Sequence, residues 1–197
     1  VIKHQFPISP LDYEPLIIIR STILPGTTKR LSKEYGFKIT HVPEFLTEAT
    51  AISDEMDPEF LVIGCDDILV REKVKDIFLN SKIQTTRVFL CNTQTAELIK
   101  YSLNSFFALK VIFANQLWDV ATKIGADFGK IETALEKHRW GSKNGWDVWH
   151  GGFRGYGGAC LPKDINAFAN AFDVSLLKEI DRINSDLIKV NKELIKE

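Results

Sequence analysis

The stretch LIIIRSTILPGTTKRLSKEYGFKITHV, residues 16–42, predicts a strand, a loop, a helix and a second strand in succession. Its first four residues are all apolar, which is typical of a strand that a parallel sheet buries on both faces. After the loop at 21–26, Thr27 suits the start of a short helix and Gly36 suits its end. Residues 37–42 then predict the next strand. Such an order of elements indicates an α/β fold.

Two further apolar runs, at 60–63 and 86–90, predict two more strands of the same sheet. Asp66 and Asp67 stand between these runs, at the start of an amphipathic stretch that predicts a helix. We therefore expect residues 1–92 to form one domain built on a parallel sheet.

The chain changes to a helical pattern from about Thr93. Residues 93–124 contain no proline or glycine and are followed by Gly125, which predicts one long helix. A second helix is expected over 127–138. We expect residues 93–197 to form an all-helical domain.

The last third of the chain begins with a segment that neither a helix nor a strand would accommodate, because residues 140–158 hold three tryptophans and seven glycines. Pro162 suits the first turn of a new helix. The final stretch carries an apolar seam with spacings of 4, 3, 4, 3 and 4, which predicts a helix of about twenty residues. This seam comprises Leu176, Ile180, Ile183, Leu187, Val190 and Leu194. It needs a partner surface, and an exposed seam would pair with a second copy of the chain.

The composition is that of an ordinary folded protein, since 45% of the 197 residues are hydrophobic and 26% are charged. The net charge of -1 argues against nucleic acid or an anionic membrane as a partner. No apolar run approaches the ~20 residues of a membrane span, and no signal-peptide pattern opens the chain. Cys65, Cys91 and Cys160 are too few and too widely spaced for a disulfide framework. These features predict a cytoplasmic protein.

Several common binding motifs are missing from the sequence. No Gly-x-Gly-x-x-Gly follows a predicted strand, and no Walker-type phosphate loop is present. The four histidines, His4, His41, His138 and His150, lack the spacing of metal ligands, so no metal site is expected. The candidate chemistry therefore lies with nucleophilic, acidic and amide side chains.

The stretch GYGGACLPKD, residues 155–164, is the strongest candidate for a chemical site. Its glycines let backbone amides approach a ligand, and a helix beginning near Pro162 directs its positive end toward the loop. The helix dipole, and also Lys163, would favour the thiolate of Cys160 and make it a better nucleophile. Asp164 lies one turn further along the same face, where it could act as a base or orient water. The alternative is a buried cysteine at a glycine-rich corner.

Two more groups of polar residues could contribute to a site. Lys100 and Asn104 project from one face of the predicted long helix, where they could hold an oxyanion or sugar hydroxyls. Spacing alone favours a simpler interpretation, a solvated stripe. Ser21-Thr22 and residues 43–48, PEFLTE, follow predicted strands, and ligands bind at the carboxyl ends of parallel strands. The two glutamates of 43–48 could position water, although surface acidic residues are commoner.

Taken together and in this order, these segments resemble the UDP-glucose/GDP-mannose dehydrogenase family. The matching pieces are STILPGTT at 21–28, PEFL at 43–46 with Glu48, AELIK at 96–100 with Asn104 and Phe106, GAD at 125–127, and GYGG at 155–158 leading into CLPKD at 160–164. The resemblance implies the second half of a Rossmann-like NAD-binding domain over 1–92, with the first βαβ unit absent. It also implies the family's central helical domain over 93–197, with a long C-terminal helix.

The resemblance implies an activity. Family members oxidise the C6 hydroxyl of a nucleotide sugar, most often UDP-glucose, to a carboxylate in two NAD-dependent steps. By resemblance, Cys160 would attack the intermediate aldehyde to give a thiohemiacetal, which oxidation converts to a thioester that water hydrolyses. Lys100 and Asn104 would stabilise the oxyanion and hold the sugar, and Asp164 would assist proton transfer.

The binding residues that the resemblance implies fall into two groups. Those expected at NAD are Ser21, Thr22, Ile23, Glu48 and Lys163. Those expected at the nucleotide sugar are Glu44, Phe45, Leu46, Thr47, Gly155, Tyr156, Gly157 and Arg139. Thr22 and Glu48 would also place a catalytic water. The resemblance further implies a homodimer formed through the helical domain.

The chain departs from the family pattern in several places. Val42, Ala49 and Phe60 stand where Asn, Gly and a basic residue are usual. Family members open with a Gly-x-Gly-x-x-Gly unit, and this chain starts downstream of it. They end with a second Rossmann-like domain, and this chain stops inside what resembles the helix before it.

Three hypotheses follow from these observations. The first is a nucleotide-sugar 6-dehydrogenase that uses NAD and Cys160. The second is a truncated, non-catalytic relative that acts as a dimerising module. The third is a cysteine hydrolase that pairs Cys160 with His138 or His150.

Overall fold

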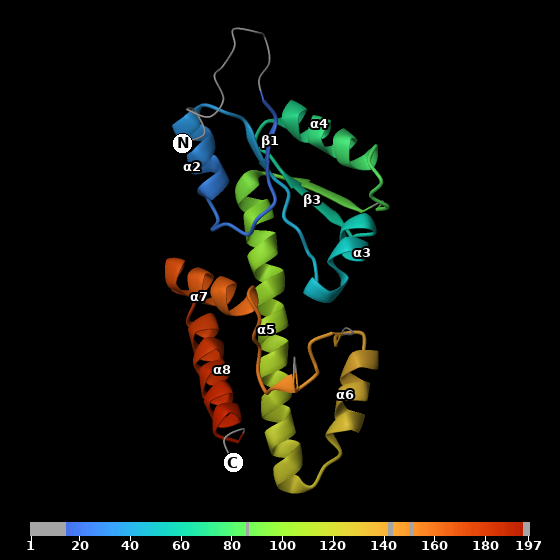
Figure 1. The fold of residues 1–197 in the computed structure, drawn as a ribbon, viewed down its shortest axis with the longest axis vertical. Helices are drawn as coiled ribbons and strands as arrows, with labels where there is room; N and C mark the ends of the chain where they lie inside the picture. The colour runs from blue at the N-terminus through green and yellow to red at the C-terminus, as the bar shows by residue number, and fades with distance from the viewer. Residues whose placement is uncertain (1–14, 86, 142–143, 150–151, 195–197) are drawn as a thin grey trace. The chain divides into compact units, whose positions relative to one another are not determined.

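The computed structural model describes residues 15–85, 87–141, 144–149 and 152–194. The chain forms two compact units, residues 1–100 and 101–197, each with its own core. The boundary between the units falls within the long helix α5 (Thr93–Ile124), which therefore contributes to both (Figure 1).

The first unit alternates strands and helices, as the sequence predicts. Its strands are β1 (Ile17–Ile19), β2 (Ile39–His41), β3 (Leu61–Gly64) and β4 (Val88–Cys91). Its helices are α2 (Thr27–Tyr35), α3 (Ala51–Met56) and α4 (Ile68–Leu79), with a 3-10 turn, η1, at Glu48–Thr50 and the first turns of α5. The predicted α/β class is confirmed.

The four strands form one sheet in the order β1-β2-β3-β4. β1 is parallel to β2 and β3 is parallel to β4, as predicted, but β2 and β3 run antiparallel through one pair, His41 and Gly64. The sheet is therefore mixed rather than fully parallel. An antiparallel pair needs no crossover connection, and the connection at 42–60 holds the short elements η1 and α3.

Local capping sets the helix ends in this unit. α2 ends at Gly36, whose φ of 73° is the left-handed conformation that glycine adopts without strain. α4 begins after Asp67, whose side chain accepts hydrogen bonds from the backbone N–H groups of Leu69 and Val70. The apolar face of α4 packs on the sheet in a core that comprises Val42, Leu61, Ile63 and Val74, with Ile18, Val70, Phe78 and Val88 around it.

The second unit is helical, as predicted. After α5 come α6 (Phe128–Lys137), α7 (Leu161–Ala171) and α8 (Ser175–Leu194). α5 has the predicted bounds and is followed by Gly125 with a φ of 72°. Figure 1 shows α7 and α8 beside one flank of α5, and α6 beside the other. The core of this unit comprises Ala108, Val111, Ile112, Tyr156, Ile165, Ala169, Leu177 and Ile180.

The predicted seam of α8 finds its partner surface inside the same chain. Ile180 is buried, and Ile183 and Leu187 pack against the core that α5 and α7 supply. Among the seam residues whose side chains the structure describes, Leu176 and Val190 stay exposed, whereas Leu177, outside the seam, is buried. The seam is therefore not the exposed stripe that would pair with a second copy.

Within the described ranges, none of the helices combines the length and the apolar composition required to cross a membrane. The same part of the chain contains no group of three or more His, Cys, Asp or Glu side chains arranged to hold a metal ion.

Candidate active site

Cys160 stands directly before α7, as its N-cap residue, and is exposed. Pro162 lies in the first turn of α7, where its missing N–H leaves no donor unsatisfied. The thiol is therefore at the positive end of a helix and not buried at a glycine-rich corner. By contrast, Cys65 is buried and Cys91 is half-buried, and burial raises the pKa of the Cys91 thiol.

Asp164 lies one turn into α7, and only 1% of it is exposed. Its backbone N–H donates to the carbonyl oxygen of Cys160 at 2.9 Å. Its Oδ2 accepts a hydrogen bond from Asn104 Nδ2 of α5 at 2.7 Å, and its Oδ1 accepts one from Lys163 Nζ at 2.5 Å. Both carboxylate oxygens are therefore held, and three residues proposed from the sequence meet at one point.

The surroundings of Asp164 are apolar on the α5 side. Tyr101 of α5 is buried and its ring stacks on that of Phe168 at 4.8 Å. Burial, and then the negative charge of Asp164, raise the pKa of the Tyr101 hydroxyl. The Lys163 ammonium forms an ion pair with Asp164. The buried carboxylate therefore has a cationic partner.

The loop that leads to Cys160 is anchored to α5 by Arg154. The Arg154 guanidinium donates from Nε to Asn115 Oδ1 at 3.0 Å and from Nη2 to the Asn115 carbonyl at 3.1 Å. It also forms an ion pair with Asp119 at 2.8 Å and lies 4.5 Å from the ring centroid of Trp118. Arg154 thus fixes the start of the loop.

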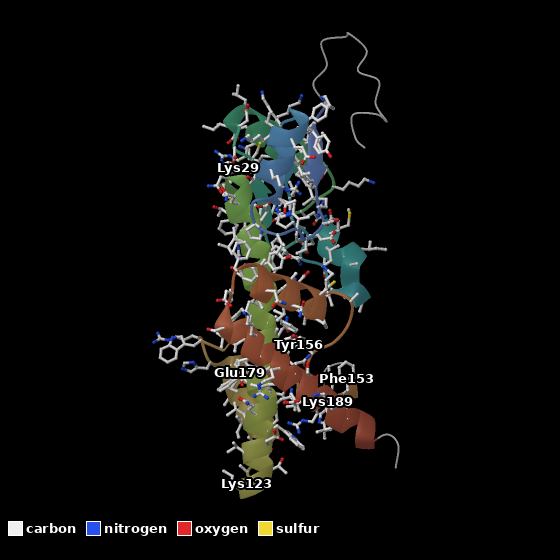
Figure 2. The ribbon with its side chains drawn as sticks, turned by 90° about the vertical axis from the view of Figure 1, so that its left-hand side faces the viewer. Lys29, Lys123, Phe153, Tyr156, Glu179 and Lys189 are labelled. Carbon is white, nitrogen blue, oxygen red and sulfur yellow. The ribbon has the colours of Figure 1, made fainter. Side chains whose placement is uncertain are left out.

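Tyr156 anchors the same loop to α8, beside which Figure 2 labels it. Its ring is fully buried in the core of the second unit, and its hydroxyl donates to Asp181 Oδ1 at 3.0 Å. Burial, and then Asp181, raise the pKa of Tyr156. Its backbone N–H and carbonyl are both bonded to Asn184. The buried ring of Tyr156 therefore supports the loop.

In the first unit, Lys100 lies over the ring of Phe45, with Nζ 5.3 Å from the ring centroid. Lys100 is buried, with 9% of it exposed, and Phe45 is half-buried. A cation over an aromatic face is stabilised electrostatically, more so when it is desolvated. This contact brings together two residues that the sequence proposes for oxyanion stabilisation and for sugar binding.

Glu97 is a buried residue of this unit whose role sequence reasoning missed. Its carboxylate accepts hydrogen bonds from the backbone N–H of Gly26 at 2.6 Å and of Thr28 at 2.7 Å, and none of it is exposed. Gly26 is the N-cap of α2 and has no side chain to cap the helix. Glu97 therefore replaces the missing cap from 71 residues away and holds the loop that follows β1.

His41 holds the same loop from the end of β2. Its Nε2 lies 3.2 Å from the carbonyl oxygen of Ser21, while its Nδ1 is buried and has no hydrogen-bond partner among the described residues. Burial lowers the pKa of His41, against opposing contributions from the Ser21 carbonyl and the Glu97 carboxylate. The side chain is therefore stabilised in its neutral form.

This lowered pKa predicts a pH dependence of stability. Below about pH 6.5 the unfolded chain gains a proton that folded His41 does not bind, so the free energy of unfolding falls as the pH drops. In the parent chain, we expect His41 to lower the free energy of unfolding by at most about 1.4 kcal/mol between pH 6.5 and 5.5. His41→Gln should abolish this decrease, as measured by urea unfolding at both pH values. The exposed His138 provides the control His138→Gln, which should keep the loss. An identical pH dependence in His41→Gln and the parent would contradict this.

The remaining proposed residues lie on or beside loops. Glu44, Leu46, Thr22, Ile23 and Gly157 are half-buried, Gly155 is buried, and Ser21, Thr47 and Arg139 are exposed. Glu48 opens η1, but its side chain lies outside the described residues, as does His150. His138 Nδ1 accepts a hydrogen bond from the backbone N–H of Trp140 at 3.3 Å, and the guanidinium carbon of Arg139 lies 5.3 Å from a Trp140 ring centroid.

Comparison with known proteins identifies both halves of the chain. Residues 8–82 match the NAD-binding domain of the UDP-glucose/GDP-mannose dehydrogenase family, and residues 94–192 match the central domain of that family.

Individual proteins of this family also match the chain. The chain is 31% identical over 184 residues to UDP-glucose 6-dehydrogenase of Rickettsia typhi, and the alignment covers 88% of this chain and 42% of that protein. It is 31% identical to GDP-mannose 6-dehydrogenase of Pseudomonas aeruginosa, with coverage of 91% and 44%. The structure of a UDP-glucose dehydrogenase from Pyrobaculum islandicum superposes with a TM-score of 0.76 at 29% identity, covering 86% of this chain and 41% of that one. The chain thus spans about two fifths of the length of these relatives.

Proposed function

The chain belongs to the UDP-glucose/GDP-mannose dehydrogenase family, and we propose that it takes part in the NAD-dependent oxidation of a nucleotide sugar at C6. The observation that carries this proposal is the arrangement at the start of α7. There an exposed thiol, Cys160, precedes a buried carboxylate, Asp164, that Asn104 and Lys163 hold in place. UDP-glucose is the first candidate substrate, because several relatives are UDP-glucose 6-dehydrogenases.

The proposed chemistry converts a primary alcohol to a carboxylate through an aldehyde. The Cys160 sulfur adds to the aldehyde carbon, forming an S–C bond while the carbonyl electron pair moves to oxygen. Removal of hydride from that carbon leaves a thioester, and water then cleaves the C–S bond to release the carboxylate and the thiol. Asn104 and Lys100 stabilise the oxyanion, and Asp164 accepts or returns protons at this centre.

The residues of the loop after β1 fit one end of NAD, which when bound supplies the hydride acceptor for both oxidations. Ser21, Thr22 and Ile23 lie at the carboxyl end of β1, where ligands bind in α/β sheets. The backbone N–H groups at the start of α2 are occupied by Glu97, so the phosphates of the dinucleotide would lie elsewhere. We assign the three loop residues to the nicotinamide end, with Glu48 and Lys163 as further contacts.

We propose that the nucleotide sugar lies against residues 44–47 and 155–157 and Arg139. Phe45 carries this assignment best, because its ring already contacts Lys100. The free thiols of all three cysteines support a reducing compartment, which we take to be the cytoplasm.

A second copy of this chain is the proposed partner, bound through the helical unit. α5 exposes a row of large apolar side chains, Phe106, Phe113, Val120 and Ile124, which are 53%, 47%, 55% and 70% exposed. Apolar faces of this kind usually mark an interaction surface. Sedimentation velocity over a range of protein concentrations tests this assignment, and a monomer throughout would contradict it.

The function itself is tested by NADH formation. We expect the purified chain to reduce NAD in the presence of UDP-glucose, GDP-mannose or a UDP-N-acetylmannosamine sugar, as followed by NADH absorbance. Cys160→Ala should lose the activity, because the covalent intermediate cannot form, whereas the matched control Cys91→Ala should keep it. A folded chain that forms no NADH with any of these substrates would contradict catalysis and favour the dimerising module. Ester hydrolysis without NAD would favour a cysteine hydrolase.

A further inference from the structure

Asn184 is a polar residue within the apolar face of α8. Only 3% of it is exposed, and the core residue Ile180 lies one turn before it on the same helix. A buried side-chain amide is costly unless its donor and acceptor are both satisfied. The hydrogen-bond partners of Asn184 therefore decide whether an amide at this buried position stabilises the fold.

Asn184 forms two hydrogen bonds with one residue of the loop, Tyr156, among the described residues. Asn184 Oδ1 accepts from the backbone N–H of Tyr156 at 2.7 Å, and Asn184 Nδ2 donates to the backbone carbonyl of Tyr156 at 2.9 Å. The side-chain amide thus forms the same donor and acceptor pair with Tyr156 that the backbone of a neighbouring strand would form. Leucine has the size but neither polar group, and aspartate lacks the donor.

The loop is shaped to admit this amide. Gly155 has a φ of 92°, and a Cβ at this position would lie 2.4 Å from Asn184 Oδ1. Asn191, two turns further along α8, donates from Nδ2 to the Arg154 carbonyl at 2.9 Å. Residues 154–156 are therefore fixed to α8. Cys160, whose thiol is exposed, follows Tyr156 by four residues, with Gly158 between them.

We propose that Asn184 is a positioning residue for Cys160, and that it acts by fixing the backbone of Tyr156 four residues before the thiol. This inference rests on the proposed role of Cys160. The thiol must form a bond to one carbon atom of the substrate and later break it. The rate therefore depends on the position of the loop that carries the thiol, because a small displacement of a nucleophile strongly reduces its reaction rate. Among the described residues, the hydrogen bonds of Asn184 go to the backbone of Tyr156 and not to Cys160.

Hydrogen exchange tests the structural part of this proposal without any need for activity. In Asn184→Leu, we expect exchange of the amides of 156–160 to rise by about tenfold to a hundredfold relative to those of α6. Gly155→Ala should also raise the exchange of these amides, because its Cβ would displace Asn184 Oδ1. The control Leu177→Ala removes buried carbon of α8 from the core that also holds the Tyr156 ring, but it removes no hydrogen bond to the loop backbone, so it should raise this ratio less. An unchanged ratio in both Asn184→Leu and Gly155→Ala, or an equal rise in Leu177→Ala, would overturn the proposal.

Steady-state kinetics test the consequence for the thiol. We expect Asn184→Leu to lower kcat for NADH formation by about tenfold or more and to raise KM for the nucleotide sugar by a smaller factor, because residues 155–157 of the same loop are proposed to contact the sugar. Leu177→Ala should change neither value at temperatures well below its Tm. A kcat that falls equally in both variants would overturn the positioning role. If the parent chain forms no NADH, the proposed function fails, and the exchange ratio still decides whether Asn184 holds the loop.

Discussion

Glu97→Leu is expected to lower the free energy of unfolding of the first unit by about 3 to 5 kcal/mol. The substitution removes the only acceptor that the structure gives the backbone N–H groups of Gly26 and Thr28 among the described residues. The Thr28 N–H is buried, so no solvent replaces the lost bond. α2 also loses the negative charge at its N-terminus. Urea unfolding followed by circular dichroism measures the effect.

Two further variants show whether the loss comes from this contact. Glu97→Gln keeps one acceptor oxygen and should give an intermediate loss. Glu34→Leu removes an exposed glutamate of α2 that forms a surface ion pair with Arg30, so it should change stability by less than about 1 kcal/mol. A loss below about 1 kcal/mol in Glu97→Leu would contradict the assigned role.

Asp164→Asn is expected to lower kcat for NADH formation by about a hundredfold to a thousandfold, with a small effect on KM. Asparagine has the same shape and can still accept a hydrogen bond from Asn104, so the fold should persist. It cannot take up a proton at the reacting centre, and it loses the ion pair with Lys163. The initial rate of NADH formation at varied substrate concentration separates the two kinetic constants.

The control for this variant is Asp173→Asn. Asp173 is exposed, lies between α7 and α8, and is paired with Lys178, so its replacement should leave kcat unchanged. Circular dichroism confirms that both variants are folded. If kcat of Asp164→Asn stays within about threefold of the parent value, the carboxylate has no part in the chemistry.

Helix bounds were largely predictable, because the signals that start and end a helix lie within a few residues of its ends. α5 begins at Thr93 and ends before Gly125, as expected from the absence of proline and glycine between them. Asp67 and Asp127 cap α4 and α6 with hydrogen bonds to backbone N–H groups two or three residues away. Pro162 likewise lies in the first turn of α7.

The chemical types of the site residues were also predictable. The pattern around 155–164 indicates an exposed cysteine before a helix, followed one turn later by a carboxylate, and both features are present. The sequence did not reveal which groups hold that carboxylate. The antiparallel pairing of β2 and β3 was missed as well, because the alternation of short apolar runs with amphipathic stretches predicts a parallel sheet and does not specify the direction of each strand.

The residues that hold the two loops in place could not be identified from local pattern. Glu97 bonds to Gly26 and Thr28, which lie 71 and 69 residues away, and Asn184 bonds to Tyr156, 28 residues away. A helix cap or a turn depends on residues that are close in sequence, so a short segment of the sequence is enough to predict it. The pairing of a buried polar group depends on which distant backbone groups folding brings within about 3 Å of it. The element types and the position of Cys160 before a helix therefore follow from the local sequence, whereas the contacts that anchor the loops depend on the tertiary structure.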